Sequence, residues 1–517
     1  MTFGLEQHII DKIITVFEAN AKVDKAYVFG SRAKGNYRPD SDIDIAIKGV
    51  DITLDDILKI SMEFEDKGIK NKIDLIDYTS IKEPALQEHI DRVGIEFYSR
   101  WKKFRFSDFV QINPTVSLKG DEEYSFVEMK DLQDGNKICL SSAKRKTSSG
   151  ARFQEKDTLF ARITPCLENG KICQVRGLEN GIGFGSTEFL VFRGKEKISN
   201  NDFVFYLSRW DEVRGFAEGN FEGTSGRQRV PKNCFDNLKL DLPPLPEQTA
   251  IASILSSLDD KIDLLQRQNK TLEQLAETLF RQMMSELRNE GLKDDRMKNE
   301  KEILQSSNPK NHNSDNGEEA EENWKVVKLE QLGQIVCGKT PSKKITDYFN
   351  GEIPFIKIPD MHGKTFVFDS EDSLTEEGLN SQRNKTIPPK SICVSCIATV
   401  GLVVMNAKTS QTNQQINSII PAKEIYRYFL YLKMLSMKDD LLAMASGGTA
   451  TDNLNTGDFS KIDIQLPNQN KLNDFHETVN PIFQKIYSNQ TQIRTLTKTR
   501  DTLLPKLMSG EVRVKNV

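Results

Sequence analysis

Two long segments of the chain carry apolar residues at alternating steps of four and three, which is the spacing of helices that pack along each other. The first series follows the prolines of LPPLPEQ and occupies Ile251, Leu255, Leu258, Ile262, Leu265, Asn269, Leu272, Ala276, Leu279 and Met283. The second series occupies Phe475, Val479, Ile482, Ile486, Asn489, Ile493, Leu496, Arg500, Leu503 and Leu507. Each series therefore predicts a long helix with a narrow apolar stripe that needs a partner helix.

The two series match in length, and each has an asparagine near its middle. If the helices lie antiparallel with flush ends, Ile251 faces Leu507 and Asn269 faces Asn489, so that the asparagine pair fixes the register. Two unrelated amphipathic helices are the alternative. Pro481 is expected to kink or start the second helix. At 1.5 Å per residue, each series forms a rod of roughly 50 Å.

The segments around these helices repeat each other. Residues 323–341 resemble 100–116, 391–406 resemble 157–172, 412–421 resemble 185–194, and 446–467 resemble 222–243. Short apolar runs separated by glycine and asparagine turns predict strands in both copies, and residues 203–213 are expected to be helical. Two copies of a mixed α/β domain, each followed by its long helix, predict a pseudo-twofold arrangement with an antiparallel helical spacer.

The N-terminal hundred residues have a different pattern. A helix is expected at residues 5–20 and a short strand at 26–29, which ends in a tight turn at Gly30 and Ser31. Backbone N–H groups in such a turn can hold a phosphate. Asp42 and Asp44 follow two residues apart on a strand, so both carboxylates point to one face. Convergent carboxylates suit Mg²⁺ and phosphoryl chemistry.

A third carboxylate is expected from the strand KIDLID, at Asp74 or alternatively at Asp77. The motifs GSRAKG, SDID and IDL together resemble the minimal nucleotidyltransferases of the polymerase-β superfamily, some of which are antitoxins that adenylylate a partner toxin. The resemblance implies that Gly30 and Ser31 contact the phosphates of a nucleoside triphosphate, and that the catalytic residues Asp42, Asp44 and Asp74 bind Mg²⁺. The usual toxin partner is not recognisable within the chain.

Charge is distributed unevenly around a net value of −4. Residues 1–99 carry 13 basic and 19 acidic side chains (−6), residues 286–323 carry 6 and 11 (−5), and the remainder therefore sums to +7. A basic surplus around the long helices favours a polyanion partner. Segment 286–323 is expected to be a helix tail followed by a flexible linker, rather than an acidic interaction arm.

Two basic segments of the first copy are candidates for DNA contact. KRKTSSGARF (144–153) is expected to be flexible, and GTSGRQRVP (223–231) is a glycine- and serine-rich loop that could approach a phosphate backbone closely. The second copy lacks these arginines and reads SGGTATDNL in the corresponding loop. The expected DNA-binding residues are Lys144, Arg145, Lys146, Arg162, Ser225, Arg227, Arg229 and Thr449.

Residues 100–517 strongly resemble the specificity (S) subunit of type I restriction-modification systems. The motifs that carry this resemblance are DTLFARITPCLENGK, GTSGRQRVP, LPPLPEQ with ILSSLDDKID, TNQQINSIIP and LLPKLMSGEV. The resemblance implies two target-recognition domains that read a split double-stranded DNA sequence, and two spacer helices that dock methyltransferase (M) subunits. A rod of roughly 50 Å corresponds to about 15 base pairs. Adenine methylation from S-adenosylmethionine and ATP-driven cleavage would belong to the M and restriction (R) subunits, since no S-adenosylmethionine site or helicase motif is recognisable here.

The expected fold class is α+β multidomain, with a small α/β nucleotidyltransferase domain and two mixed α/β domains separated by two antiparallel coiled-coil helices. The expected order is 1–99 nucleotidyltransferase-like domain, 100–245 first target-recognition domain, 246–290 first spacer helix, 291–323 flexible acidic linker, 324–467 second target-recognition domain, and 468–517 second spacer helix with the C-terminal tail.

Two functions from different classes are compatible with this order. The first is a DNA-specificity subunit with an appended nucleotidyltransferase. The second is a nucleotidyltransferase that modifies a protein or nucleic acid and is targeted by the repeat module. A product of two neighbouring genes joined in frame near Tyr98–Trp101 is also compatible, because the junction has no linker.

Cysteine usage and hydropathy indicate a reduced, cytoplasmic protein. The seven cysteines are odd in number and irregularly spaced, and no run of about 18 apolar residues predicts a membrane span. Cys393 and Cys396 form a C-x-x-C pair in an apolar, strand-like run without a second pair or a nearby histidine, so neither zinc nor redox chemistry is expected there.

Overall fold

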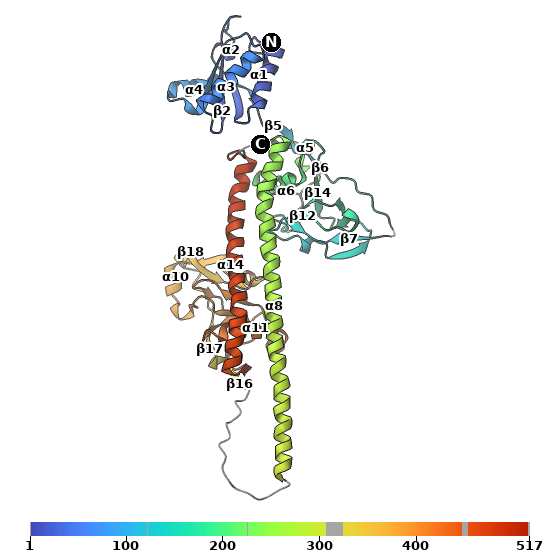
Figure 1. Cartoon of the computed structure of the whole chain (residues 1–517), viewed down its shortest axis with the longest axis vertical. Helices are drawn as coiled ribbons and strands as arrows, with labels where there is room; N and C mark the ends of the chain where they lie inside the picture. The colour runs from blue at the N-terminus through green and yellow to red at the C-terminus, as the bar shows by residue number, and fades with distance from the viewer. Residues whose placement is uncertain (1, 121, 225, 307–323, 447–452, 515–517) are drawn as a thin grey trace. The chain divides into compact units, whose positions relative to one another are not determined.

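The computed structural model describes residues 2–120, 122–224, 226–306, 324–446 and 453–514, without the side chains of 287–306 (Figure 1). The chain divides into two compact units. The first comprises Met1–Asp263 with Thr495–Val517, and the second comprises Leu264–Arg494. No helix in the described ranges has the length and apolar character that crossing a membrane requires.

The N-terminal part of the first unit is a four-stranded sheet with helices packed on it. The strand order is β3-β2-β1-β4, in which β2 and β3 are parallel and the other pairs antiparallel. One face of α1 is buried because Ile10, Ile13 and Phe17 recur at steps of three and four. The elements are α1 (Gln7–Ala19), β1 (Val23–Val28), α2 (Gly30–Lys34), β2 (Ile43–Gly49), α3 (Leu54–Asp66), β3 (Ile73–Asp77), α4 (Pro84–Val93) and β4 (Ile95–Ser99).

The first repeat domain, at residues 100–245, has two main sheets. A five-stranded sheet has the order β6-β14-β11-β12-β8, and a four-stranded sheet has the order β10-β13-β7-β9. Strand β5 (Lys102–Arg105) pairs with β15 (Lys239–Leu242). The remaining elements are α5 (Phe106–Phe109), β6 (Val110–Ile112), β7 (Glu123–Val127), β8 (Ile138–Cys139), β9 (Ala143–Lys146), β10 (Ala151–Gln154), β11 (Thr158–Ala161), β12 (Ile172–Val175), β13 (Ile182–Gly185), β14 (Phe189–Gly194), α6 (Asn201–Arg209) and α7 (Asp211–Gly219).

One local expectation for this domain was wrong. The basic segment 144–153 is not a flexible loop, because its ends form strands β9 and β10 in the four-stranded sheet. At these two ends, pairing with β7 and β13 overrides the local sequence preference. The helical character expected at 203–213 is confirmed, in the form of two helices, α6 and α7, separated by Trp210 in an extended conformation.

The second repeat domain, at residues 324–467, has a five-stranded sheet of order β17-β24-β21-β22-β19 and a three-stranded sheet of order β20-β18-β23. Strand β16 (Trp324–Lys328) pairs with β25 (Asp463–Pro467). The remaining elements are β17 (Gly333–Cys337), β18 (Phe349–Ile356), α9 (Ile358–Met361), β19 (Phe366–Val367), β20 (Asp372–Leu374), α10 (Glu376–Asn380), β21 (Ile392–Ser395), β22 (Val403–Asn406), β23 (Gln411–Thr412), β24 (Ile416–Pro421), α11 (Tyr426–Ser436), α12 (Lys438–Ala445) and α13 (Thr456–Ser460).

The five-stranded sheets of the two repeat domains correspond strand by strand. In both, the first three neighbouring pairs are antiparallel and the last pair, β12–β8 or β22–β19, is parallel. The terminal strand pairs β5–β15 and β16–β25 also correspond. The second sheets differ, since one has four strands and the other three. The internal repeat seen in the sequence is thus a repeat of topology.

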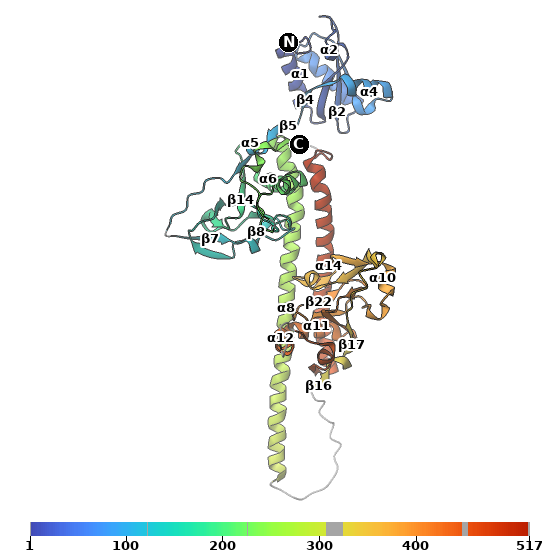
Figure 2. The same ribbon diagram turned by 180° about the vertical axis from the view of Figure 1, so that it is seen from behind.

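Two long helices, α8 (Leu245–Ser306) and α14 (Gln469–Met508), each contribute a stretch to both units (Figures 1 and 2). In the first unit, Ile251 and Leu255 share a core with Leu507 and Met508. In the second unit, Ala276 and Phe280 share a core with Val479 and Phe483. The order of these contacts confirms the antiparallel pairing.

The ends of these helices differ from the expected bounds. Pro481 lies inside α14, which is continuous from Gln469, so it does not start the helix. Helix α8 continues to Ser306, which is beyond the expected end at residue 290 and inside the segment expected to be a linker. Residues 307–323, the rest of that segment, lie outside the described residues.

Candidate functional site

Three aspartates of the N-terminal domain meet at one end of the parallel strands β2 and β3. Asp44 and Asp74 are register partners across the two strands, and Asp42 directly precedes β2. The ammonium group of Lys72 lies 2.9 Å from an Asp42 carboxylate oxygen and 3.2 Å from one of Asp74. The structure therefore brings together Asp42, Asp44 and Asp74, with a lysine ammonium between two of them.

The electrostatics of this cluster favour a bound cation. Partial burial, and then the neighbouring Asp74 and Asp42 carboxylates, raise the pKa of Asp44 above its ordinary value. Hydrogen bonds to Asp42 and Asp74 raise the pKa of Lys72, so this side chain stays cationic. The excess of negative charge is thus partly compensated by one ammonium group.

The donor set of this cluster fits Mg²⁺, since carboxylate oxygens are the ligands that this ion prefers. Within the described part of the chain, no three His, Cys, Asp or Glu side chains are arranged as a metal site. The Lys72 ammonium lies against Asp42 and Asp74 instead. A metal ion bound by Asp42, Asp44 and Asp74 would therefore replace the Lys72 contacts.

The Asp44 carboxylate lies close to the backbone of Gly30. Gly30 follows β1, has φ of +69°, and begins the short helix α2 that also contains Ser31. A Cβ atom at Gly30 would lie 2.1 Å from an Asp44 carboxylate oxygen. Glycine is therefore required by both the left-handed backbone and the close approach of the carboxylate. The two candidate nucleotide-binding residues lie beside the aspartate cluster.

Asp77, the alternative third carboxylate, has a structural role instead. Its side chain is only 4% exposed. The carboxylate accepts hydrogen bonds from the backbone N–H of Thr79 at 3.0 Å and from the Thr79 hydroxyl, and so closes the turn after β3. Of the two aspartates in KIDLID, Asp74 is the one that lies beside Asp44.

Arg32 was missed by the sequence reasoning, although it lies inside the GSRAKG motif. The buried guanidinium donates to the carbonyl oxygens of Ser41 at 2.6 Å, Asp42 at 3.1 Å and Phe3 at 3.0 Å. It thereby fixes the loop that delivers Asp42 to the cluster. No periodicity or spacing could have revealed this role, because the acceptors are backbone atoms.

The candidate DNA-binding residues of the first repeat domain fall into two groups. Three of the cations form ion pairs with glutamates of the same domain: Lys144 with Glu179 at 2.6 Å, Arg145 with Glu128, and Arg229 with Glu188 at 2.8 Å. Lys146 and Arg227 are exposed and form no ion pair within the described ranges. The charge of the first group is already partly neutralised within the domain.

The remaining candidates are Arg162, Ser225 and Thr449, of which the structure describes only Arg162. Arg162 is half-buried, and its Nε has no hydrogen-bond partner in the described part of the chain. Ser225 and Thr449 lie outside the described residues.

A polar cluster in the first unit was not foreseen from the sequence. Arg513, in the tail after α14, binds the Glu247 carboxylate through Nε at 2.5 Å and Nη2 at 2.8 Å, and pairs with Asp24 through Nη1. The indole N–H of Trp101 donates to Glu247 at 3.1 Å. Burial raises the pKa of Asp24, although Arg513 counteracts this shift. The cluster joins the N-terminal domain to the first turn of α8 and to the tail.

Comparison with known proteins identifies both parts of the chain. A family model described as the type I restriction modification DNA specificity domain matches residues 98–274 and 321–499. The chain belongs to this family. A second model, described as polymerase beta, nucleotidyltransferase, matches residues 11–103. Both resemblances drawn from the sequence motifs are confirmed, and the first model matches once per repeat.

Relatives of the family align over most of the chain. The HindI specificity subunit of Haemophilus influenzae is 35% identical, with 80% of this chain and 100% of that protein covered. The MjaIX specificity subunit of Methanocaldococcus jannaschii is 25% identical, with 61% and 70% covered.

Solved structures were also compared. The HsdS subunit of Thermoanaerobacter tengcongensis has 16% identity and a TM-score of 0.31, with 80% of this chain and 97% of that chain covered. The S subunit of M. genitalium has 14% identity and a TM-score of 0.44, with 79% and 96% covered. A toxin-antitoxin MntA-HepT structure covers 18% of this chain and 73% of that chain, with 23% identity and a TM-score of 0.15.

Proposed function

We propose that this chain is the specificity subunit of a type I restriction-modification complex, reading a split double-stranded DNA sequence for two M subunits and the R subunits. The observation that carries the proposal is the family match to both repeats, each of which combines a mixed α/β domain with a stretch of long helix. S-adenosylmethionine and ATP would be used by the partner subunits, in the cytoplasm where the DNA lies.

Two non-identical recognition domains imply two different half-sites. The domains share the five-stranded sheet, but they differ in their second sheet, and the loop at 223–231 has arginines that the loop around 446–454 lacks. Base edges are read by the side chains that reach the grooves, so domains with different side chains read different bases. The antiparallel helices would set the number of base pairs between the half-sites.

A map of modified bases tests this function directly. Genomic DNA from cells that express the chain with its M subunit is expected to carry methyladenine in one motif, with two short half-sites around a fixed gap. Absence of such a motif, while the same M subunit methylates DNA beside another S subunit, would refute the proposal. Lengthening α8 and α14 together by one heptad should lengthen the gap without changing either half-site.

We further propose that the N-terminal domain transfers a nucleoside monophosphate from a triphosphate to an acceptor and releases pyrophosphate. Asp42, Asp44 and Asp74 would hold Mg²⁺, which neutralises developing charge on the transferred phosphoryl group when it is bound. The turn at Gly30 and Ser31 would face the phosphates. The convergence of the three carboxylates beside this turn supports the proposal.

The alternative function places the nucleotidyl transfer first and uses the repeat module as its targeting device. The triple variant Asp42→Asn/Asp44→Asn/Asp74→Asn separates the two, and the charge-matched control is Asp40→Asn/Asp55→Asn/Asp66→Asn, at three exposed positions of the same domain. A specificity subunit with an appended enzyme predicts that methylation continues and transfer of label from α-labelled ATP stops. Loss of the restriction or modification phenotype in the triple variant, but not in the control, would favour the alternative.

A further inference from the structure

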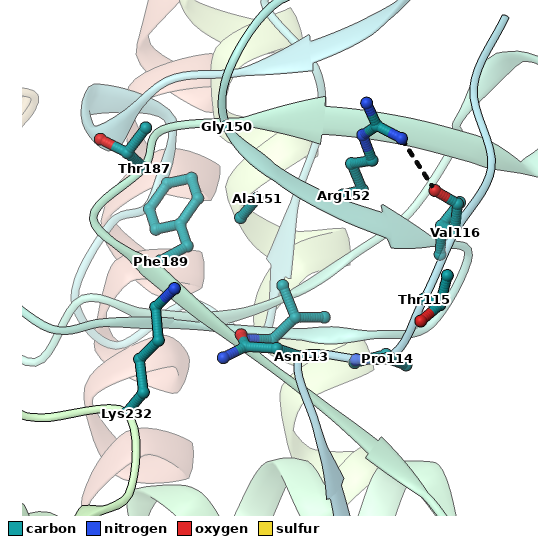
Figure 3. Close-up of a pocket in the computed structure, with 11 residues that line it drawn as sticks. Asn113, Pro114, Thr115, Val116, Gly150, Ala151, Arg152, Thr187, Phe189 and Lys232 are labelled. Atoms are coloured by element: carbon teal, nitrogen blue, oxygen red, sulfur yellow. Dashed lines mark hydrogen bonds between the residues drawn. The ribbon is translucent and has the colours of Figure 1, made fainter.

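The first repeat domain contains a half-open cavity of about 350 Å³ between its two main sheets and the segment after the 223–231 loop. Its wall includes Asn113, Arg152, Thr187, Phe189 and Lys232, with Phe189 and Lys232 visible at one side and Arg152 at the other (Figure 3). Phe189 is almost fully buried, so the ring forms an apolar floor and is not free for stacking.

The cavity lies between the two basic segments that the sequence indicated. Gly150 and Arg152 belong to the segment 144–153, and Lys232 directly follows the loop 223–231. Neither Arg152, Lys232 nor Asn113 was among the candidate DNA-binding residues. Both basic segments thus contribute to the wall of one cavity, through residues that the sequence motifs did not indicate.

Three lining side chains, those of Lys232, Arg152 and Asn113, offer N–H donors to this cavity. Lys232 is exposed and forms no ion pair in the described part of the chain, and Arg152 makes one long hydrogen bond, 3.5 Å, to the carbonyl oxygen of Val116. Asn113 accepts the backbone N–H of Val191 at 3.0 Å through Oδ1, which leaves the Nδ2 hydrogens available. No described lining residue carries a carboxylate.

Asn113 is also held in an uncommon backbone conformation, with φ of +49°. Its backbone N–H donates to the Val191 carbonyl at 2.7 Å, so both its backbone and its side chain are tied to the same residue of β14. Strain of this kind persists where the surroundings over-determine it, and it is concentrated at binding sites. The Asn113 amide is therefore rigidly positioned.

We propose that this cavity binds a phosphate group of the DNA backbone, with Arg152 and Lys232 supplying the positive charge and Asn113 a directed N–H. The inference rests on the proposed DNA-reading function and extends it to a named contact. Unlike Lys144, Arg145 and Arg229, these two cations have no glutamate partner among the described residues. Phosphate binding by an unpaired cation releases condensed counterions, whereas a paired cation must first lose its own carboxylate.

The test uses the full chain assembled with its M subunits, and compares wild type with Lys232→Gln, Arg152→Gln and Asn113→Asp. Binding to a cognate duplex and to an unrelated duplex is measured over a range of salt concentrations. Lys232→Gln and Arg152→Gln should each weaken both duplexes by the same factor, and each should reduce the slope of log K against log salt by about 0.9. Asn113→Asp keeps the acceptor for Val191 but brings a negative charge, so it should weaken both duplexes as well.

The matched control is Lys239→Gln on β15, another exposed lysine without an ion pair in the described ranges. It should leave affinity and salt slope unchanged. Unchanged binding in Lys232→Gln and Arg152→Gln would overturn the proposal. A loss confined to one base position of the cognate duplex would overturn it in favour of base reading. If the wild-type complex itself does not discriminate between the duplexes, the DNA-reading function fails instead.

Discussion

The asparagine pair in the helix spacer can be tested quantitatively. Asn489 donates through Nδ2 to the side-chain oxygen of Asn269 at 2.9 Å, and the two side chains are 0% and 6% exposed. Both residues lie in the second unit. The register predicted from the heptads, in which these two residues face each other, is confirmed.

Replacing Asn269 by leucine removes the acceptor and leaves the Asn489 amide in an apolar seam. Its other contact, to the Gln268 side-chain oxygen, is 3.5 Å long. An unsatisfied buried polar group costs about 1–3 kcal/mol, whereas removing both partners can be nearly neutral. Asn269→Leu should therefore lower the free energy of unfolding, and the double change Asn269→Leu/Asn489→Leu should restore it.

The two single variants should not be equivalent. The Oδ1 of Asn489 already lacks a hydrogen-bond partner in the described part of the chain, so Asn489→Leu also removes an existing unsatisfied acceptor. In this variant the Asn269 side chain loses its partner, but it remains slightly exposed to solvent. We expect Asn489→Leu to cost less than Asn269→Leu.

The assay is thermal unfolding of the full chain, combined with hydrogen exchange of the helix amides around both sites. The double-mutant cycle should give a coupling energy in the range of about 0.5–3 kcal/mol. Asn473→Leu, at an exposed position of α14, is the control and should change stability by less than about 0.5 kcal/mol. Equal stability of the Asn269→Leu single variant and the double variant would refute the pairing argument.

Three further outcomes are expected. Gly30→Ala should abolish nucleotidyl transfer while methylation continues, because its Cβ would collide with the Asp44 carboxylate; retained transfer would contradict this. Arg500→Met should lower the free energy of unfolding by about 3–5 kcal/mol, measured by urea denaturation, because the buried Asp259 carboxylate loses the cation that binds it at 2.6 Å and is left with the hydrogen bond from the Tyr206 hydroxyl. Burial raises the pKa of Cys393 to about 12, so iodoacetamide at pH 8 should alkylate this thiol only after unfolding.

Some features were predictable because their cause is local or periodic. The helix pairing follows from a repeat of 3.5 residues and one asparagine per series, both of which can be read along the chain. The convergence of Asp44 with Asp74 follows from two parallel strands whose residues alternate between faces. In each case a spacing in the sequence fixes which side chains meet.

Other features depend on partners that no spacing reveals. The segment around Lys144–Lys146 is polar and looks like a loop, but it forms strand β9 because β7 supplies a partner. Lys72 approaches Asp42 across two neighbouring strands, and Arg32 binds carbonyl oxygens of a loop. Such contacts are set by tertiary structure, and the sequence pattern of the segment alone does not encode them.

The junction between the N-terminal domain and the specificity module bears on whether the fusion is accidental. Arg513 lies in the tail that follows α14, yet its guanidinium pairs with both Asp24 of the N-terminal domain and Glu247 of α8. The backbone N–H of Arg100 also donates to the Asp24 carbonyl at 2.8 Å, which continues the N-terminal sheet into the junction. Glu247 is buried and Asp24 is partly buried, so removal of Arg513 would leave two neighbouring carboxylates without this cation, which is costly. We therefore propose that the nucleotidyltransferase domain is a natural part of this chain, since Arg513 of the specificity module pairs with Asp24 of the N-terminal domain.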